Sequence, residues 1–277
     1  MGIASDRPIL VLGGTGTVGA RVVEQLRATG VVARPVTRGT DPPFDWGDPG
    51  TWDAALDGVH RLYLLLPDDG ELPGGFLERA SAAGVRRVVL HSDRGVDVMS
   101  VERLQRAEAA VRGSGLEWTI LRPDWFDQNF ETFLRDDVLA GRVALPVGDG
   151  RQGFVDAEDI AAVAVRALVT DDHLGEVLEL TGPEALSFGE AAAAIGRATG
   201  RNVTYVGEPA EYREAMAVAG LPEPVVDGIV AQLAPLRAAG DTTPTGTVER
   251  VLGRPALAFE DYASDAAKRG VWGGVAH

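Results

Sequence analysis

The chain has 277 residues, and its 26 basic and 41 acidic side chains give a formal net charge of −15 at pH 7. This length allows one large domain or two modest ones, and the acidic balance argues against nucleic acid as a direct partner, because phosphate binding needs a basic surface. The absence of cysteine excludes disulfides, thiolate nucleophiles and zinc–sulfur sites, and the four histidines show no ligand spacing. No apolar run is long enough for a membrane span or a secretory signal. We therefore expect a cytoplasmic protein without a metal site.

A short apolar strand near 8–12 runs through a glycine-rich turn into an amphipathic helix. Gly14, Gly16 and Gly19 satisfy the spacing G-x-G-x-x-G, and Gly13 with the last two satisfies the related G-x-x-G-x-x-G. Such glycines permit a tight turn, close approach of a pyrophosphate and close packing of helix on strand. The turn predicted to hold a dinucleotide comprises Gly13, Gly14, Thr15, Gly16, Thr17, Val18 and Gly19.

The end of the second strand, near 31–37, indicates which dinucleotide binds. An acidic residue there would hold the ribose hydroxyl of NAD, whereas Arg38 stands about 20 residues beyond the glycine turn, where a 2′-phosphate partner belongs. NADP(H) is therefore favoured over NAD(H). Asp41 and Asp45 lie nearby and leave an adenosine contact open.

Strand-like and helix-like segments alternate through the first half of the chain, which is typical of a parallel sheet with crossover helices. Strands are expected near 8–12, 31–37, 43–46, 61–66, 86–91 and 117–121. Helices are expected near 17–29, 50–56, 73–83 and 99–113, with glycines where they end. The sequence therefore predicts an α/β fold with a Rossmann-type, doubly wound parallel sheet.

After Arg122 and Pro123 the pattern changes to longer helices separated by loops. We expect helices near 158–169, 187–199, 222–239 and 259–269, a strand near 176–181 and a loop over 240–247. Residues 1–150 are assigned to an NAD(P)-binding domain and 151–277 to a smaller, mostly helical lobe that binds substrate. The strand near 176–181 can return to the first domain. The carboxyl ends of the strands are where ligands bind in such sheets.

Several short motifs then occur together: residues 13–19, Arg38, residues 55–59, 114–123, Asn129, 154–161, 180–184 and 253–254. With them, the chain resembles the NmrA-like group of atypical short-chain dehydrogenases/reductases over nearly its whole length. The resemblance implies a Rossmann domain that binds NADP(H), with substrate entering beside the C-terminal lobe. The group includes NADPH-dependent reductases of quinones and other small molecules, and also NADP-binding regulators that bind a transcription factor.

The usual proton donor of short-chain dehydrogenases, a Tyr with a Lys four residues later, is absent. Four residues after the tyrosines stand Pro67, Pro209, Met216 and Ala266, and Lys268 is the only lysine. The resemblance would place a Lys or His eleven residues before Gly115, where the chain has Leu104. Arg103 and Arg106 lie close to it, but neighbouring helix positions point in other directions.

His91, Ser92 and Asp124 remain as catalytic candidates near the carboxyl ends of two predicted strands. The run His91-Ser92-Asp93 does not predict a catalytic triad, because consecutive strand residues point to opposite faces. His91 could donate a proton or be structural, and Ser92 could contact a ligand or cap the next turn. The resemblance also places Leu66, Pro67, His91 and Ser92 at the cofactor.

The loop after the sixth predicted strand mixes aromatic and polar side chains. Trp125 and Phe126 suit a flat, partly apolar substrate, although they could instead pack the two lobes together. Asn129 matches the family motif and is expected to fix the loop backbone, and Phe154 could form a far wall of the pocket. The predicted substrate contacts are Trp125, Phe126, Asn129 and Phe154.

The sequence favours an NADPH-dependent reductase that transfers hydride to a quinone, enone, ketone or imine. A redox-sensing NADP(H)-binding regulator that binds a protein partner is the second interpretation, and a non-redox biosynthetic enzyme on the same fold is the third. The expected partner is a small-molecule substrate, with no membrane and no direct nucleic acid. A homodimer is left open.

Overall fold

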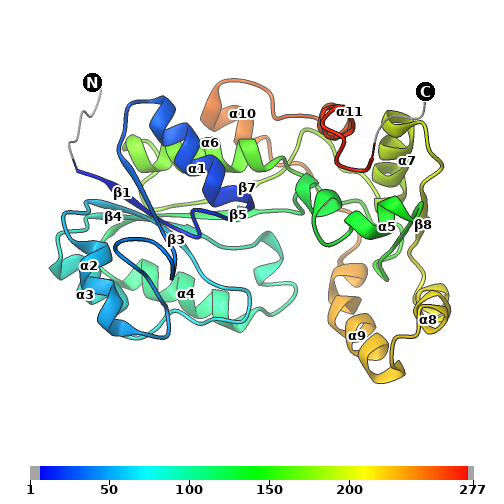
Figure 1. The fold of residues 1–277 in the computed structure, drawn as a ribbon, viewed down its shortest axis with the longest axis horizontal. Helices are drawn as coiled ribbons and strands as arrows, with labels where there is room; N and C mark the ends of the chain where they lie inside the picture. The colour runs from blue at the N-terminus through cyan, green and yellow to red at the C-terminus, as the bar shows by residue number, and fades with distance from the viewer. Residues whose placement is uncertain (1–6, 274–277) are drawn as a thin grey trace.

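A six-stranded, wholly parallel sheet forms the centre of the part of the chain that the computed structural model describes, residues 7–273 (Figure 1). The strand order is β2-β1-β3-β4-β5-β7. The strands are β1 (Ile9–Leu12), β2 (Ala33–Val36), β3 (Arg61–Leu65), β4 (Arg87–His91), β5 (Glu117–Pro123) and β7 (Glu176–Leu180). The chain direction across the sheet reverses between β1 and β3, and such switch points are where ligands bind in open α/β sheets.

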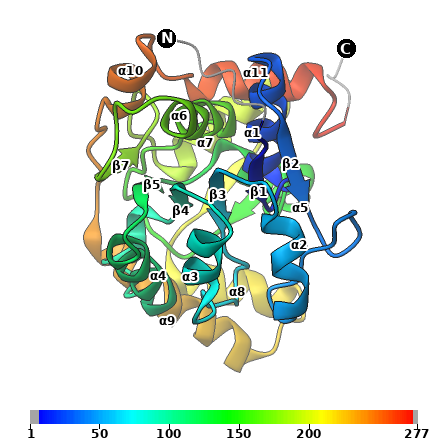
Figure 2. The ribbon, with the colours of Figure 1, turned by 90° about the vertical axis from the view of Figure 1, so that its left-hand side faces the viewer.

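Helices cover both faces of this sheet (Figure 2). One face carries α1 (Thr17–Ala28), α6 (Ala157–Val169) and α10 (Thr247–Leu252). The other carries α2 (Trp52–Leu56), which follows the short helical turn η1 (Pro49–Thr51), together with α3 (Phe76–Ala82) and α4 (Glu102–Gly113). This arrangement confirms the predicted Rossmann-type fold.

The strand sequences explain the two helical layers, because alternate side chains of a strand point to opposite faces. Leu62 and Leu64 of β3 pack with α2, α3 and α4, whereas Tyr63 packs with α1 and α6. In β4, Val88 and Val89 divide in the same way. Strands that are apolar on both faces belong in the middle of such a sandwich.

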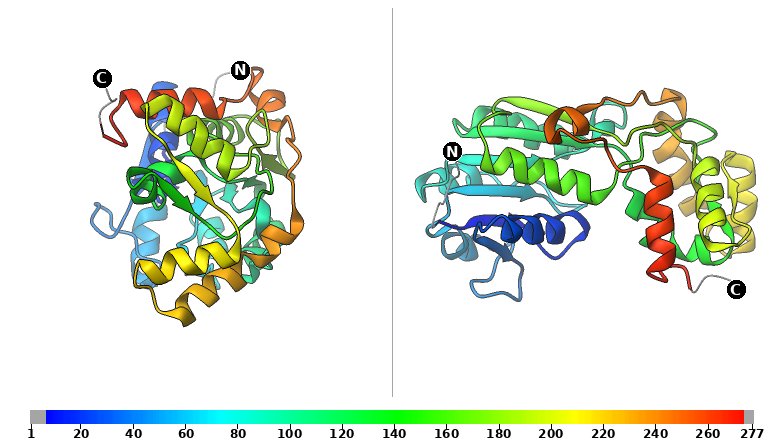
Figure 3. Two further views of the ribbon diagram at one scale, coloured as in Figure 1. Left: turned by 90° about the vertical axis from the view of Figure 1, so that its right-hand side faces the viewer. Right: turned by 90° about the horizontal axis from the view of Figure 1, so that it is seen from above.

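The remaining elements lie beyond the carboxyl edge of the sheet (Figures 1 and 3). They are α5 (Arg135–Leu139), β6 (Arg142–Ala144), α7 (Phe188–Thr199), β8 (Thr204–Val206), α8 (Pro209–Val218), α9 (Glu223–Ala239) and α11 (Phe259–Lys268). Strands β6 and β8 form a small parallel sheet. An aromatic core that includes Phe130, Phe188, Phe259 and Trp272 holds this part together.

One predicted strand is wrong: residues 43–46 form no strand in the structure. The Phe44 ring is buried against Trp46 and Phe76, so its apolar character serves packing at the edge of the sheet. The backbone of Asp45 is held by the side chains of Thr51 and Trp52 instead of by a neighbouring strand.

Elements from both sides of residue 150 build the main sheet and its layers. Strand β7 pairs with β5 along its whole length, and α6 packs lengthwise on α1. None of the helices described is long and apolar enough to cross a membrane.

Candidate functional site

The turn between β1 and α1 is formed by very close backbone contacts. Gly13 is left-handed, with φ of 69°, and the Gly16 amide donates to its carbonyl over 2.9 Å. A Cβ on Gly19 would lie 2.1 Å from the Gly13 carbonyl oxygen, and one on Gly14 would lie 2.6 Å from the Cβ of Pro35. Glycine is required at these positions, because a side chain would force α1 away from the strands.

Gly16 has a different environment from these tightly packed glycines. It is exposed, and a Cβ built there would meet only the Gly13 carbonyl oxygen, at 3.4 Å. It caps α1, whose first turn contains no acidic side chain. The amides of that turn point along the helix axis toward open space, and they suit an anion such as a pyrophosphate. The chain therefore fits the dinucleotide that its sequence predicts.

Arg38 lies in the turn after β2, at the same edge of the sheet as the glycine turn. Its side chain is exposed and makes no hydrogen bond or ion pair with any residue in the described range. A free guanidinium at this position is suited to bidentate binding of a phosphate.

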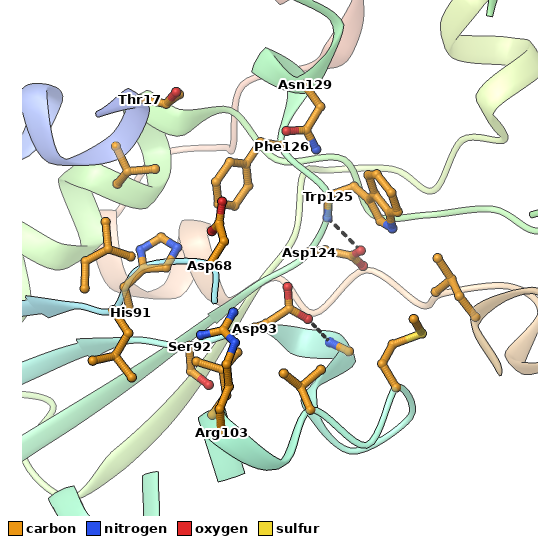
Figure 4. Close-up of a pocket in the computed structure, with 18 of the residues that line it drawn as sticks. Thr17, Asp68, His91, Ser92, Asp93, Arg103, Asp124, Trp125, Phe126 and Asn129 are labelled. Carbon is orange, nitrogen blue, oxygen red and sulfur yellow. Dashed lines mark hydrogen bonds between the residues drawn. The ribbon is translucent and has the colours of Figure 1, made fainter. Parts of the chain in front are cut away.

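A cavity of about 480 Å³ opens at the carboxyl ends of β3, β4 and β5, beside the start of α1 (Figure 4). The lining residues come from the start of α1 (Thr17, Val18), the ends of β3 and β4 and the residues after them (Leu65, Leu66, Asp68, His91, Ser92, Asp93), the segment before α4 (Gly95, Met99, Val101), the first turn of α4 (Arg103, Leu104), the loop after β5 (Asp124, Trp125, Phe126, Asn129) and α9 (Leu233, Leu236). This volume suits a small organic molecule or part of a larger one.

His91 lines the cavity, and its Nδ1 atom lies 2.6 Å from the hydroxyl oxygen of Tyr63. Tyr63 is fully buried in the middle of the sheet and is not part of the cavity wall. Burial lowers the pKa of His91 to about 4 and raises the pKa of Tyr63. Both groups are therefore neutral at physiological pH.

Ser92 also lines the cavity, but its hydroxyl proton already has an acceptor. The Oγ atom donates to Oε1 of Glu108 over 2.6 Å. Burial works to raise the pKa of Glu108, yet hydrogen bonds from Arg122 and Ser92 lower it below its usual value. Glu108 is therefore a carboxylate, which can only accept. The serine oxygen is left with acceptor capacity toward the cavity, and its proton is unavailable to a substrate.

Asp124 is likewise occupied by protein contacts. Its carboxylate accepts hydrogen bonds from Arg94 at 2.8 Å, from the Trp125 amide at 2.8 Å and from the Gly153 amide at 3.2 Å. Arg94 also binds Glu179 of β7. Asp124 therefore joins the loops around the cavity, and this geometry does not fit the predicted role of proton donor.

The aromatic loop lines the cavity and also packs against other aromatic rings. Trp125 lines the cavity and also packs edge-on against Phe188, with ring centres 5.0 Å apart. Phe126 lines the cavity and packs edge-on against His91 at 5.7 Å. These two rings form the apolar side of the cavity and fix its position between the sheet and the C-terminal elements.

Asn129 lines the cavity, as a predicted substrate contact should, whereas Phe154 does not. The Asn129 side chain lines the cavity and makes no hydrogen bond within the described chain, while its backbone carbonyl accepts from the Leu134 amide. Phe154 is buried in the aromatic core against Phe130 and Phe188, and it does not line the cavity. The far wall is formed instead by Leu233 and Leu236.

At position 104, where the resemblance implies a Lys or His, the chain has a leucine. Leu104 lines the cavity, and Lys268 is paired with Asp265 on the exposed face of α11. Arg103 reaches the cavity despite its neighbouring helix position, and its Nη1 donates to the carbonyl oxygen of Pro67. Leu66 is in the wall, whereas the exposed Pro67 lies just outside it.

Sequence reasoning missed the partners that determine what the strand-end residues can do. Tyr63 contacts His91 from the neighbouring strand, Glu108 contacts Ser92 from α4, and Arg94 contacts Asp124 across 30 residues of sequence. Only the fold creates these three contacts. Asp68 and Asp93 also went unremarked as cavity residues. Their place directly after apolar strands was an available signal, since ligands gather at that edge.

A parallel sheet with this glycine turn, and with a cavity across its carboxyl edge, defines a dinucleotide-binding protein of the Rossmann type. A family model described as NAD(P)H-binding matches residues 44–171. The chain is 34% identical to the NAD(P)H azoreductase of Xenophilus azovorans, over 92% of this chain and 96% of that protein. It is 34% identical to the uncharacterized oxidoreductase YesF of Bacillus subtilis, over 96% and 97% respectively.

The fold also matches that of the NADPH-dependent quinone oxidoreductase QOR2 of Escherichia coli in complex with NADPH. The TM-score is 0.77 at 24% identity, covering 93% of this chain and 99% of that one. The chain therefore belongs to the same NAD(P)H-binding family as the azoreductase and YesF, in agreement with its resemblance to the NmrA-like group of atypical short-chain dehydrogenases/reductases. Its curated relatives include oxidoreductases, and NAD(P)H is the cofactor of the family.

Proposed function

We propose that the protein is an NADPH-dependent reductase of a flat, electron-poor organic molecule such as a quinone, enone, ketone or imine. The observation that carries this proposal is the cavity of about 480 Å³ between the glycine turn and the aromatic loop. Trp125 and Phe126 supply an apolar wall, and His91 and Asn129 supply polar atoms that no other described residue engages on the cavity side. This combination of apolar walls and few polar groups is typical of small-molecule sites.

The preference for NADPH over NADH rests on Arg38. Its unpaired guanidinium stands where the adenosine ribose of a dinucleotide lies in this type of fold. A bidentate interaction with the 2′-phosphate would be available to NADP(H) alone. We expect NADPH to be the working cofactor and the cytoplasm to be the location of the protein.

Bound NADPH would supply the hydride, and the protein orients the acceptor and excludes water. His91 offers a hydrogen bond to the acceptor, Ser92 offers an acceptor oxygen, and Asp124 holds the loops in place. Asp93 is an acidic side chain of the cavity whose pKa is raised by burial, so the proton that completes the reduction comes from Asp93 or from water. Electron-poor acceptors suit such a site, because they need little acid assistance.

The names of curated relatives support reduction as the activity. They include the azoreductase above, a quinone oxidoreductase 2 of Escherichia coli at 25% identity and a (4-alkanoyl-5-oxo-2,5-dihydrofuran-3-yl)methyl phosphate reductase of Streptomyces griseus at 32% identity. The first two act on conjugated acceptors by name. We infer the same general class here.

The first experiment measures affinity for NADPH and NADH, and then follows loss of nicotinamide absorbance with a panel of quinones, azo dyes, enones, ketones and cyclic imines. Tight NADPH binding with turnover on any acceptor class supports the reductase. Tight binding without turnover on the whole panel would contradict it. That result would favour a redox-sensing regulator, for which the missing Tyr and Lys pair is the specific observation.

A further inference from the structure

A buried polar contact behind the cavity wall joins two neutral groups, His91 and Tyr63. The two residues lie on neighbouring strands, β4 and β3, and their polar atoms are 2.6 Å apart. Tyr63 is fully buried, and its hydroxyl has no other hydrogen-bond partner among the described residues. The contact must therefore satisfy the tyrosine as well as the histidine.

Only one arrangement of the protons does so. If Nδ1 of His91 carried the proton and donated to Tyr63, the phenol O–H would be buried without an acceptor, which is unfavourable. If Tyr63 donates to Nδ1, its O–H has an acceptor. The neutral imidazole must then carry its own proton on Nε2. The desolvated imidazole is uncharged, so this Nε2–H is the one polar hydrogen on the ring.

The Nε2 atom points away from Tyr63, since the two nitrogens lie on opposite sides of the ring. It makes no hydrogen bond within the described residues and is not sealed from solvent, and His91 lines the cavity (Figure 4). Phe126 packs against the ring and restricts its rotation. The ring is therefore held from two sides, with one donor directed at the cavity.

We propose that Tyr63 is a positioning residue that fixes His91 as a neutral Nε2–H donor to the substrate. This inference rests on the proposed reductase function. It narrows the substrate to hydride acceptors with an oxygen or nitrogen atom that gains negative charge during reduction, such as a quinone carbonyl or an azo group. A permanently cationic acceptor such as an alkylated iminium gains no negative charge, so the donor gives it no help.

The direct test is nitrogen NMR of protein with isotope-labelled histidine, saturated with NADP⁺, at about pH 7.5. His91, identified by the loss of its signals in His91→Gln, should show a neutral ring with the proton on Nε2 and a hydrogen-bonded Nδ1. In Tyr63→Phe, the Nδ1 resonance should move to the position of a nitrogen without a donor. A charged His91, or one protonated on Nδ1 in the wild-type protein, would overturn the proposal.

Kinetics provide a second test with matched substitutions. His91→Gln keeps an N–H near the position of Nε2, whereas His91→Asn does not reach it. We expect kcat for a quinone to fall by about 100-fold in His91→Asn and by about tenfold or less in His91→Gln and Tyr63→Phe, with KM for NADPH unchanged. For an alkylated iminium, the three variants should lose much less kcat than they lose for the quinone.

Tyr262→Phe is the control for Tyr63→Phe. It also removes a buried phenol hydroxyl, but one that has no hydrogen-bond partner in the described part of the chain and lies in the C-terminal core. Equal losses in the two Tyr→Phe variants would contradict the proposal. A wild-type protein without turnover on any acceptor would contradict the reductase function alone, because the NMR experiment still decides the state of His91.

Discussion

Arg38 gives the clearest prediction at the level of single residues. Arg38→Ala should weaken NADPH binding by about 10- to 100-fold, because a charge-assisted bidentate contact with the 2′-phosphate is lost. NADH binding should change little, since NADH lacks that phosphate. Titration of both cofactors measures the effect, and Arg27→Ala, which removes another exposed arginine from α1, is the control. A similar loss for both cofactors would refute the assignment.

Asp127 is a fully buried carboxyl whose two oxygens have no hydrogen-bond partner among residues 7–273. Burial, with the nearby charges of Asp156 and Asp159, raises its pKa well above the usual value. Its stabilising contribution is therefore present below the unfolded pKa and is lost as pH rises through the folded pKa. The fold is predicted to become less stable because of Asp127 as the solution becomes alkaline.

Asp127→Asn removes this titration. We expect the variant to gain about 1–2 kcal/mol of unfolding free energy over the wild type at about pH 8 and to gain much less at about pH 4. Urea unfolding at both pH values measures the difference, and the exposed Asp136→Asn is the control. A gain that is independent of pH would contradict the explanation.

The sequence was sufficient to place His91 and Ser92 at the end of a strand, next to the cavity. It was insufficient for their chemistry, since Tyr63 and Glu108 lie on other elements and decide where each proton resides. Asp124 shows the same limit, because its partner Arg94 was one of many arginines in the sequence. The local sequence pattern predicts where these side chains lie, and their tertiary contacts determine which of them can donate a proton.

At the level of elements, the glycine turn contains glycines that are required for packing and a glycine, Gly16, that has space around it. Gly19→Ala should destabilise the fold by several kcal/mol or abolish it, because the new Cβ would lie 2.1 Å from the Gly13 carbonyl oxygen. Gly16→Ala should fold normally, since its backbone is extended and its Cβ has space, but it should bind NADPH more weakly. Thermal unfolding and NADPH titration distinguish the two effects. Normal stability of Gly19→Ala would contradict the tight packing.

Element prediction succeeded where periodicity and glycine ends agreed. The helices near 17–29, 187–199 and 222–239 are within a few residues of α1, α7 and α9. It failed over 43–46, where aromatic side chains look strand-like but fill the edge of the core. The short β6 and β8 were missed, because three residues give too little pattern for a strand.

At the level of the whole molecule, we predict that residues 1–150 do not fold stably without the rest of the chain. Val89 and Leu121 of the sheet are buried against Ile160 and Ala164 of α6, and β7 covers the edge of β5. A fragment of residues 1–150 should therefore melt without a cooperative transition and bind a hydrophobic dye, unlike the full chain. A cooperative melt of the fragment would support an independent domain with the predicted boundary.

The far wall of the cavity belongs to a helical hairpin, α8 and α9, whose own core is built with residues of β6 and β8. Leu233 and Leu236 are therefore carried by a segment that adds nothing to the interior of the main sheet. Mutations in this hairpin can change the shape of the cavity while the dinucleotide turn is preserved. Within a lineage, this separation allows the choice of substrate to evolve quickly on a conserved cofactor scaffold, and it makes α9 the natural segment to randomise in directed evolution.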